Sequence, residues 1–215
     1  MQKILVIQTA FIGDVVLATA LFEKIHVYYP QDQIDFLLRK GNEGLLKDHP
    51  FIHEVLIWDK KENKLKNLFR LLLEIRKRKY DKVINLQRFA STGMLTGFSK
   101  AKERIGFDKN PFSFLFTKKI PHHFKNGMHE VERNNKLIEN FTDARFNKPK
   151  LYPTSKNEAE ILPYTQTPYI CMFPASVWYP KPSPANPWIN LLNQVPAQFN
   201  IYLLGGKTDM EMCER

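Results

Sequence analysis

An aspartate at the start of a predicted helix is the first residue whose type and position could do chemistry. Gly13 and Asp14 follow an apolar run at residues 4–8, and apolar residues recur after them at helical spacing. In an open parallel sheet, ligands bind outside the carboxyl ends of the strands, and Gly13 permits close approach of the backbone there. The helix dipole holds a carboxylate ionised at such a terminus, so Asp14 could accept a proton from a substrate hydroxyl. Capping of the helix is the alternative role of Asp14.

Neither nicotinamide nor metal chemistry is indicated by the sequence. Residues 8–14 contain one glycine where the dinucleotide-binding fingerprint needs three. The histidines at residues 122–129 have no cysteine at a supporting spacing, and only Glu130 and Glu132 stand near them as carboxylates. A surface loop that leads into a helix explains these histidines better. We therefore expect no metal ion and no other cofactor.

The elements that would position Asp14 alternate between strands and helices. Short buried runs bounded by charged or turn residues predict strands, and the stretches between them are long enough for helices. This alternation predicts an α/β fold with a parallel sheet that helices cover on both faces. The predicted strands are residues 4–8, 34–38, 55–58 and 83–86, and a stripe of Leu65, Leu68, Leu72 and Ile75 predicts a helix between the last two.

The second half of the chain predicts a loop, a linker and the start of another α/β unit. Residues 107–121 lose a clear period, and residues 129–141 resume a helical one. A proline-rich stretch at residues 147–168 is typical of a linker. Two strands and one helix after it cannot cover both faces of a sheet, so we expect a truncated chain. The predicted parts are a first domain at residues 1–147, a linker at 148–168 and an incomplete second domain at 169–215, with strands at 169–173 and 200–204.

The net charge of the chain favours anionic partners. Thirty-two Lys and Arg against twenty-two Asp and Glu leave +10, which suits nucleic acid, phosphorylated sugars or lipid headgroups. The hydrophobic fraction of 43% supports a packed core. Cys171 and Cys213 are too few for a disulfide framework, which favours a reducing cytosol. No eighteen apolar residues run together, so any membrane contact is expected to be peripheral.

Short motifs along almost the whole chain carry a resemblance to a known family. They are residues 4–8 (ILVIQ) with 13–19 (GDVVLAT), 85–87 (NLQ) with Ser91, 104–107 (RIGF), 129–134 (HEVERN), 174–176 (PAS) with Lys181, and 203–206 (LLGG). In this order they resemble the ADP-heptose:lipopolysaccharide heptosyltransferases, which form glycosyltransferase family 9. Each motif is moderately specific alone, and their common order makes a chance match improbable.

The resemblance implies a GT-B fold, in which a Rossmann-like domain that binds the acceptor precedes a second one that binds most of the nucleotide sugar. It implies an inverting transfer of heptose from ADP-heptose to a lipopolysaccharide core acceptor, with Asp14 as the general base. Ser176 and Lys181 would stabilise the departing diphosphate. The family's acidic nucleotide-site motif would fall beyond Arg215, so we expect no detectable heptose transfer by these 215 residues alone.

The resemblance also implies supporting residues and partners. The absence of an Asp-x-Asp triplet agrees with a metal-independent transfer. The expected partners are a nucleotide sugar, a lipopolysaccharide core or lipid A-type acceptor, and the inner-membrane surface, which the protein would meet from the cytoplasm. The acceptor-side candidates are Gln87, Arg88 and Ser91, and the glycines expected to shape the site loops are Gly13, Gly205 and Gly206.

Other functions stay open on the sequence alone. Nucleic-acid binding would fit the charge and the aromatic content, but no helix-turn-helix, RNP or zinc-finger pattern supports it, so we expect no nucleic-acid partner. A catalytically incompetent fragment that only binds the acceptor would differ from the enzyme in the sequence beyond Arg215. The basic, leucine-rich residues 64–79 fit a membrane-surface helix or a helix packed on the sheet. The alternating phenylalanines of residues 112–116 fit either lipid contact or a strand.

Overall fold

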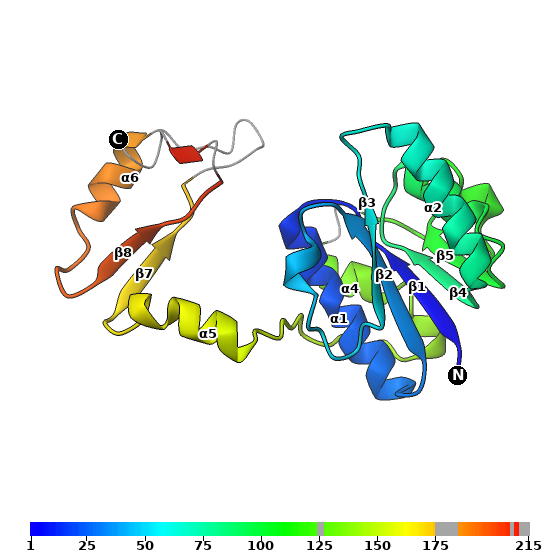
Figure 1. Cartoon of the computed structure of the whole chain (residues 1–215), viewed down its shortest axis with the longest axis horizontal. Helices are drawn as coiled ribbons and strands as arrows, with labels where there is room; N and C mark the ends of the chain where they lie inside the picture. Colours follow the sequence, from blue (N-terminus) through cyan, green and yellow to red (C-terminus); the bar gives the residue numbers. More distant parts are fainter. Residues whose placement is uncertain (124–126, 175–184, 207–208, 211–215) are drawn as a thin grey trace. The chain divides into compact units, whose positions relative to one another are not determined.

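The computed structural model describes residues 1–123, 127–174, 185–206 and 209–210. The chain forms two compact units, Met1–Tyr152 and Pro153–Arg215 (Figure 1). Among the described residues, every buried hydrophobic side chain except Met172 belongs to the first unit. The first unit therefore has the core that can hold a site rigidly.

A six-stranded parallel sheet forms the centre of the first unit. Its strand order is β3-β2-β1-β4-β5-β6. In β1, Val6 stands opposite Phe36 of β2 on one side and Ile84 of β4 on the other. A strand with neighbours on both sides and helices on both faces is apolar throughout, which explains the unbroken run in the sequence. The strands are β1 (Lys3–Ile7), β2 (Gln33–Arg39), β3 (Glu54–Trp58), β4 (Lys82–Asn85), β5 (Glu103–Phe107) and β6 (Lys118–Ile120).

Helices cover both faces of this sheet (Figure 1). On one face, Val15 and Leu21 of the first helix pack with Ile4. On the other face, Leu68 of the second helix packs with Leu5. Because successive residues of a strand point to opposite faces, β1 supplies both cores, and each such buried side chain contributes about 1.5–3 kcal/mol. The helices are α1 (Ile12–Tyr28), α2 (Lys64–Arg78), α3 (Ala90–Gly97) and α4 (Glu130–Asn135).

The four strands predicted from apolar runs in this unit are confirmed, β5 coincides with the family-like motif at residues 104–107, and β6 was not predicted. Residues 107–121, predicted as a loop, contain the 3-10 turn η2 (Ser113–Leu115) and the edge strand β6. Two of the three residues of β6 are lysines, which is common at a sheet edge because they discourage pairing with another chain. Phe114 is exposed and Phe116 is buried, so the alternating phenylalanines belong to a turn and not to a strand.

The buried face of α2 differs from the predicted stripe at two residues. Leu68, Leu72 and Ile75 are buried as expected, and Leu71 joins them. Leu65, however, is 69% exposed. The leucine spacing predicted the direction of the buried stripe correctly but began it one turn too early.

The second unit contains two parallel strands and short helices. Ile170 of its first strand stands opposite Ile201 of its second. Its first helix is capped by Thr154, whose Oγ1 accepts a hydrogen bond from the Asn157 N–H at 3.2 Å. The two strands predicted in this part, at residues 169–173 and 200–204, are confirmed, each ending one residue earlier than predicted. The elements of the second unit are α5 (Ser155–Ile161), the 3-10 turn η4 (Leu162–Tyr164), β7 (Tyr169–Met172), α6 (Ala185–Leu192) and β8 (Asn200–Leu203).

Candidate active site at the carboxyl edge of the sheet

The connections of the sheet change direction between β1 and β4. The chain leaves β1 for α1 on one face, and it leaves β4 for α3 on the other. Open α/β sheets bind their ligands at such a point, outside the carboxyl ends of the strands. Here a buried hydrogen bond joins the two strand ends, since the Thr9 hydroxyl donates to Gln87 Oε1 at 2.6 Å. Thr9 and the predicted residue Gln87 therefore form one rigid part of the site.

Side-chain hydrogen bonds hold the loop that carries Gln87. Asn85 Oδ1 accepts the Gln87 N–H at 2.9 Å. Asn110 Nδ2 donates to the carbonyl oxygens of Gln87 at 3.1 Å and Phe89 at 3.0 Å. The lack of a side chain at Gly93 makes room for this amide, because a Cβ there would lie 1.9 Å from Asn110 Oδ1. The loop after β4 is thus fixed from both β4 and the segment after β5.

Lys60 is a site residue that the sequence did not single out. Its Nζ donates to both the carbonyl oxygen and the hydroxyl of Thr9, each at 2.8 Å. The ammonium also lies 4.7 Å from the centre of the Trp58 ring. Burial, and after it the charges of Arg39 and Lys64, lower the pKa of Lys60 to about 8. No sequence pattern distinguishes Lys60 from the many other lysines of the chain, so this contact could be found only in the folded structure.

A pocket of about 550 Å³ opens beside this lysine at the carboxyl edge. The predicted residue Ser91 lies in its wall, at the start of α3. Most of the wall is apolar or aromatic, and two ammonium groups interrupt it. Such a lining suits a ligand with an apolar part and an anionic part. The pocket is lined by Trp58, Lys60, Lys64, Leu65, Leu68, Phe89, Ala90, Ser91, Met94 and Phe112.

Asp14 lies in the first turn of α1, which begins after the short loop that follows Thr9. Phe11 is the N-cap, so Asp14 stands at the third helical position, where its Oδ2 accepts the Phe11 N–H at 3.2 Å. Asp14 therefore supports the helix start without being the cap residue itself. Its Oδ1 accepts no hydrogen bond from a described residue, and the space beside Gly13 is open. Asp14 is half-buried and does not line the pocket of Ser91.

Arg88 adds a further positive charge at the same edge. Its side chain is exposed on the loop after β4. Burial, and after it the nearby guanidinium groups of Arg88 and Arg133, keep the pKa of His122 below its usual value. Of the histidines that the sequence placed in a loop leading into a helix, His129 caps α4, since its ring accepts the Val131 N–H.

The predicted donor-side residues belong to the second unit. Ser176 and Lys181 lie outside the described residues. Gly206 donates its N–H to Asp209 Oδ2 at 2.7 Å, and a Cβ at Gly205 would lie 3.0 Å from the Asp209 Cβ. The two glycines therefore allow a tight turn after β8, in the position where the sequence predicted loop support.

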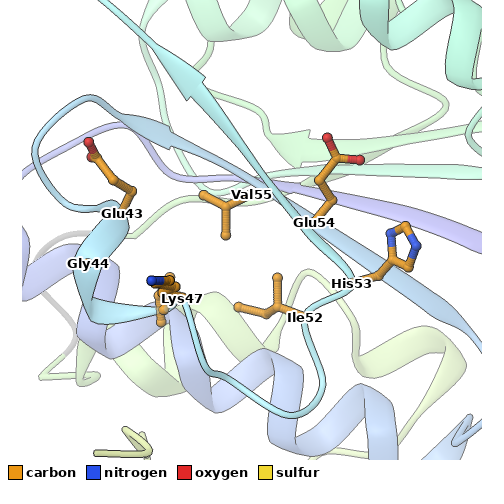
Figure 2. A pocket seen from close by; sticks show the side chains of 8 residues that line it. Glu43, Gly44, Lys47, Ile52, His53, Glu54 and Val55 are labelled. Carbon is orange, nitrogen blue, oxygen red and sulfur yellow. The ribbon is translucent and has the colours of Figure 1, made fainter. Parts of the chain in front are cut away.

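A smaller pocket, of about 310 Å³, lies between the 3-10 turn η1 (Glu43–Leu45) and the start of β3 (Figure 2). Figure 2 shows the apolar side chains of Ile52 and Val55 lining it, with charged groups at its margin. The residues that line it include no serine, threonine or cysteine and no glycine-rich phosphate-binding loop. This pocket has no arrangement that resembles the carboxyl-edge site.

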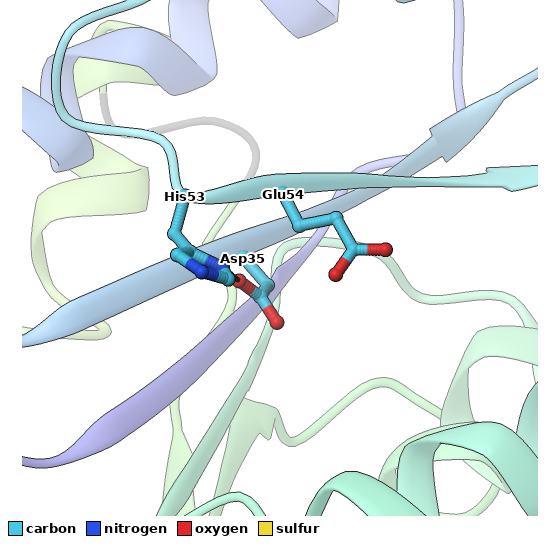
Figure 3. A group of neighbouring side chains, drawn as sticks. All are labelled: Asp35, His53 and Glu54. Atoms are coloured by element: carbon cyan, nitrogen blue, oxygen red, sulfur yellow. Dashed lines mark hydrogen bonds and ion pairs between the residues drawn. The ribbon is translucent and has the colours of Figure 1, made fainter.

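Asp35, His53 and Glu54 form one group whose ligand-type atoms lie within 4.8 Å of one another (Figure 3). The Asp35 carboxylate already accepts the Tyr80 hydroxyl at 2.5 Å and the His53 ring at 3.0 Å. Arg78 binds both oxygens of Glu54 and also reaches Asp35. A cation would have to displace this guanidinium. The group lies at the amino ends of β2 and β3, so we interpret it as a structural ion-pair network.

A comparison of the sequence with models of known protein families identifies the family of the chain. The model of glycosyltransferase family 9 (heptosyltransferase) matches residues 68–215, more than half of the chain. The chain belongs to this family. The resemblance carried by the motifs is therefore confirmed.

Individual family members resemble the chain more weakly in sequence than in fold. Lipopolysaccharide heptosyltransferase 1 of Campylobacter coli is 26% identical over 137 residues, which cover 64% of this chain and 39% of that protein. The crystal structure of a family 9 glycosyl transferase from Veillonella parvula has a TM-score of 0.86 at 21% identity, and covers 99% of this chain and 65% of that one. The E. coli heptosyltransferase WaaC with ADP-2-deoxy-2-fluoro heptose has a TM-score of 0.71 at 20% identity, with coverages of 99% and 72%.

These matches confirm the predicted fold class, an α/β fold of the GT-B type. The chain spans 39% of the length of the Campylobacter family member and 65% of the Veillonella structure. Among the described residues, no helix is both long and apolar enough to cross a membrane.

Proposed function

We propose that this chain provides the acceptor side of an inverting glycosyltransferase that moves heptose from ADP-heptose to a lipopolysaccharide core acceptor. The observation that carries the proposal is the Asp14 carboxylate, with one oxygen unengaged among the described residues, at the carboxyl edge where the sheet changes direction. Family membership supplies the reaction class.

In the proposed reaction, Asp14 accepts the proton of an acceptor hydroxyl as that oxygen attacks the anomeric carbon of the donor. The bond from this carbon to the diphosphate oxygen breaks on the opposite face, and ADP departs with the electron pair. The configuration at the anomeric carbon therefore inverts.

The acceptor would bind at the basic pocket of the carboxyl edge. Lys60 and Lys64 would act as point charges for its anionic groups, with Arg88 on the neighbouring loop. The Ser91 hydroxyl stands in the pocket wall as a hydrogen-bonding group for the sugar. The link from Lys60 through Thr9 to Gln87 would keep the charge at a fixed position as substrate binds.

The donor would bind through the second unit. The WaaC structure with an ADP-heptose analogue supports a nucleotide sugar of this kind. We assign Ser176 and Lys181 to the departing diphosphate and the turn at Gly205 and Gly206 to loop support, as the motifs imply. The enzyme would work without a metal ion, in the cytoplasm at the inner-membrane surface, and without a nucleic-acid partner.

The variant Asp14→Asn, made in the enzyme as its source organism produces it, tests the role of the base. An asparagine still accepts the Phe11 N–H but cannot take a proton, so we expect kcat to fall by about 10²-fold or more at unchanged acceptor affinity. Asp32 is a matched control, since its carboxylate also accepts a backbone N–H, from Gln2 at 2.7 Å. Asp32→Asn should leave kcat unchanged. A kcat within about tenfold of wild type for Asp14→Asn would reduce Asp14 to a helix-supporting residue.

A further inference from the structure

The outer face of α2 is apolar where a surface helix is normally polar. Leu65, Phe69 and Leu73 are spaced by four residues, so they form one stripe along the helix. Their side chains are 69%, 57% and 65% exposed. They lie outside the stripe that packs on the sheet. The helix therefore carries a second apolar surface that its own fold does not need.

A row of cations runs beside this stripe. Lys66, Arg70 and Lys77 are exposed, and none of them forms a salt bridge with a described residue. At about 100° per residue they fall on the side of the stripe that faces away from the sheet. The only acidic residue of α2 is Glu74, and Arg78 binds it at 2.6 Å. The outer surface of α2 thus carries an apolar row of side chains beside a row of positively charged ones. We call these six residues the α2 docking face.

We propose that the α2 docking face binds the surface of a membrane that contains anionic lipids. A helix that lies in the membrane interface has this pattern, with apolar side chains among the acyl chains and Lys or Arg near the headgroups. A second copy of the chain is a poorer occupant, because it would bring the same cations against themselves in a chain of net charge +10. Nucleic acid would use the cations but leave the apolar stripe in water.

The α2 docking face adjoins the carboxyl-edge pocket, which suggests a function for membrane contact. Leu65 belongs both to the docking face and to the wall of the carboxyl-edge pocket. Phe89, in the same wall, is 63% exposed. A membrane on the α2 docking face would therefore lie beside the mouth of the pocket, where a lipid-linked acceptor could enter without leaving the bilayer. The inference deepens the proposed membrane location and does not depend on the transfer reaction.

Vesicle co-sedimentation of the 215-residue chain tests the proposal. We expect binding to phosphatidylcholine vesicles that contain phosphatidylglycerol, weak binding to phosphatidylcholine alone, and release at high salt, because the attraction falls off within a Debye length. Replacing either half of the docking face should lower the partition coefficient at least about tenfold. The two variants are Leu65→Gln/Phe69→Gln/Leu73→Gln and Lys66→Gln/Arg70→Gln/Lys77→Gln.

Two control variants remove the same chemistry elsewhere on the surface. The side chains that the control variants replace are all exposed, so neither control should change the melting temperature by a large amount. Both should bind vesicles as wild type does. They are Val27→Gln/Ile161→Gln/Leu162→Gln for the apolar variant and Lys3→Gln/Lys47→Gln/Lys148→Gln for the charge variant.

Each other outcome overturns the proposal. Equal losses in the docking-face and control variants would mean nonspecific attraction of a basic chain to anionic lipid. Unaltered vesicle binding after both docking-face changes would place the contact elsewhere. A chain that dimerises through this face in ultracentrifugation and ignores vesicles would have a second copy as its occupant. Failure of heptose transfer would not affect any of these readouts, so the two proposals fail separately.

Discussion

Lys60 connects the electrostatics of the carboxyl edge to its hydrogen bonds. Its ammonium donates to Thr9, and the Thr9 hydroxyl in turn donates to Gln87, so one cation orders the ends of β1 and β4. Burial and the neighbouring charges of Arg39 and Lys64 bring its pKa to about 8. The residue is therefore charged at neutral pH and loses its charge as the pH rises through that value.

We expect the affinity for an anionic core oligosaccharide to depend on this titration. One unit above its pKa only about a tenth of Lys60 is charged, so the affinity should fall roughly tenfold between about pH 7 and pH 9. Lys60→Arg keeps the charge throughout this range and should remove the pH dependence. Titration calorimetry on the chain measures both. The same decline in Lys60→Arg would assign the titration to another group.

Individual candidate site residues could be predicted only where the residue type suits the chemistry and the position in the sequence is distinctive. Asp14 stands out because a carboxylate at a strand-to-helix turn has few roles, whereas Gln87 and Ser91 were indicated by the resemblance of their motif to the family. Lys60 has the same chemistry as thirty-one other cationic residues of the chain, and what distinguishes it is burial against Trp58. The desolvation of Lys60 results from tertiary packing, so no local sequence pattern predicts it.

Helix α3 positions the loop after β4 through a glycine. Gly93 leaves the space that Asn110 occupies, and Asn110 donates to the carbonyl oxygens of Gln87 and Phe89. This contact ties the helix, the loop and the segment after β5 together. The shape of the loop after β4, the proposed acceptor side, therefore depends on a residue that has no side chain to contact a substrate.

Gly93→Ala should destabilise the first unit despite the better helix propensity of alanine. The new Cβ would displace the Asn110 amide, and we expect the free energy of unfolding to fall by about 1–3 kcal/mol, against about 1 kcal/mol of helix gain. Urea unfolding measures the difference. Gly44→Ala serves as the control, because a Cβ at that position meets nothing within 4 Å. Equal stability of the two variants would contradict the tight packing at Gly93.

Elements with a strong apolar period were predictable, and elements held by tertiary contacts were not. The run of β1 is apolar because both faces are covered, so its sequence alone reveals it. Strand β6 has two lysines in three residues and exists because β5 offers it a partner. Leu65 fits the leucine period of α2 but lies outside the area that the sheet covers. The hydrophobic period of a helix predicts which of its faces is buried. The size of the surface that it packs against decides how many residues of that face are buried.

Three regions of the first unit have different tasks. The carboxyl edge carries Asp14 and the basic pocket, and the adjoining outer face of α2 is apolar and positive. The amino edge of β2 and β3 carries the network of Asp35, Glu54 and Arg78, which satisfies its own charges. The proposed acceptor site, the proposed membrane contact and the structural ion pairs thus occupy different regions of the unit.

The transfer reaction itself is the central claim, and one product analysis tests it most directly. The enzyme, as its source organism produces it, is incubated with ADP-heptose and a heptose-free lipopolysaccharide core acceptor. Mass spectrometry then follows the acceptor, and NMR determines the anomeric configuration of the new linkage. We predict an acceptor that carries one added heptose, formed at a rate on the order of one per second, with the configuration inverted relative to the donor. An acceptor that stays unmodified, or a linkage that retains the donor configuration, would contradict the account.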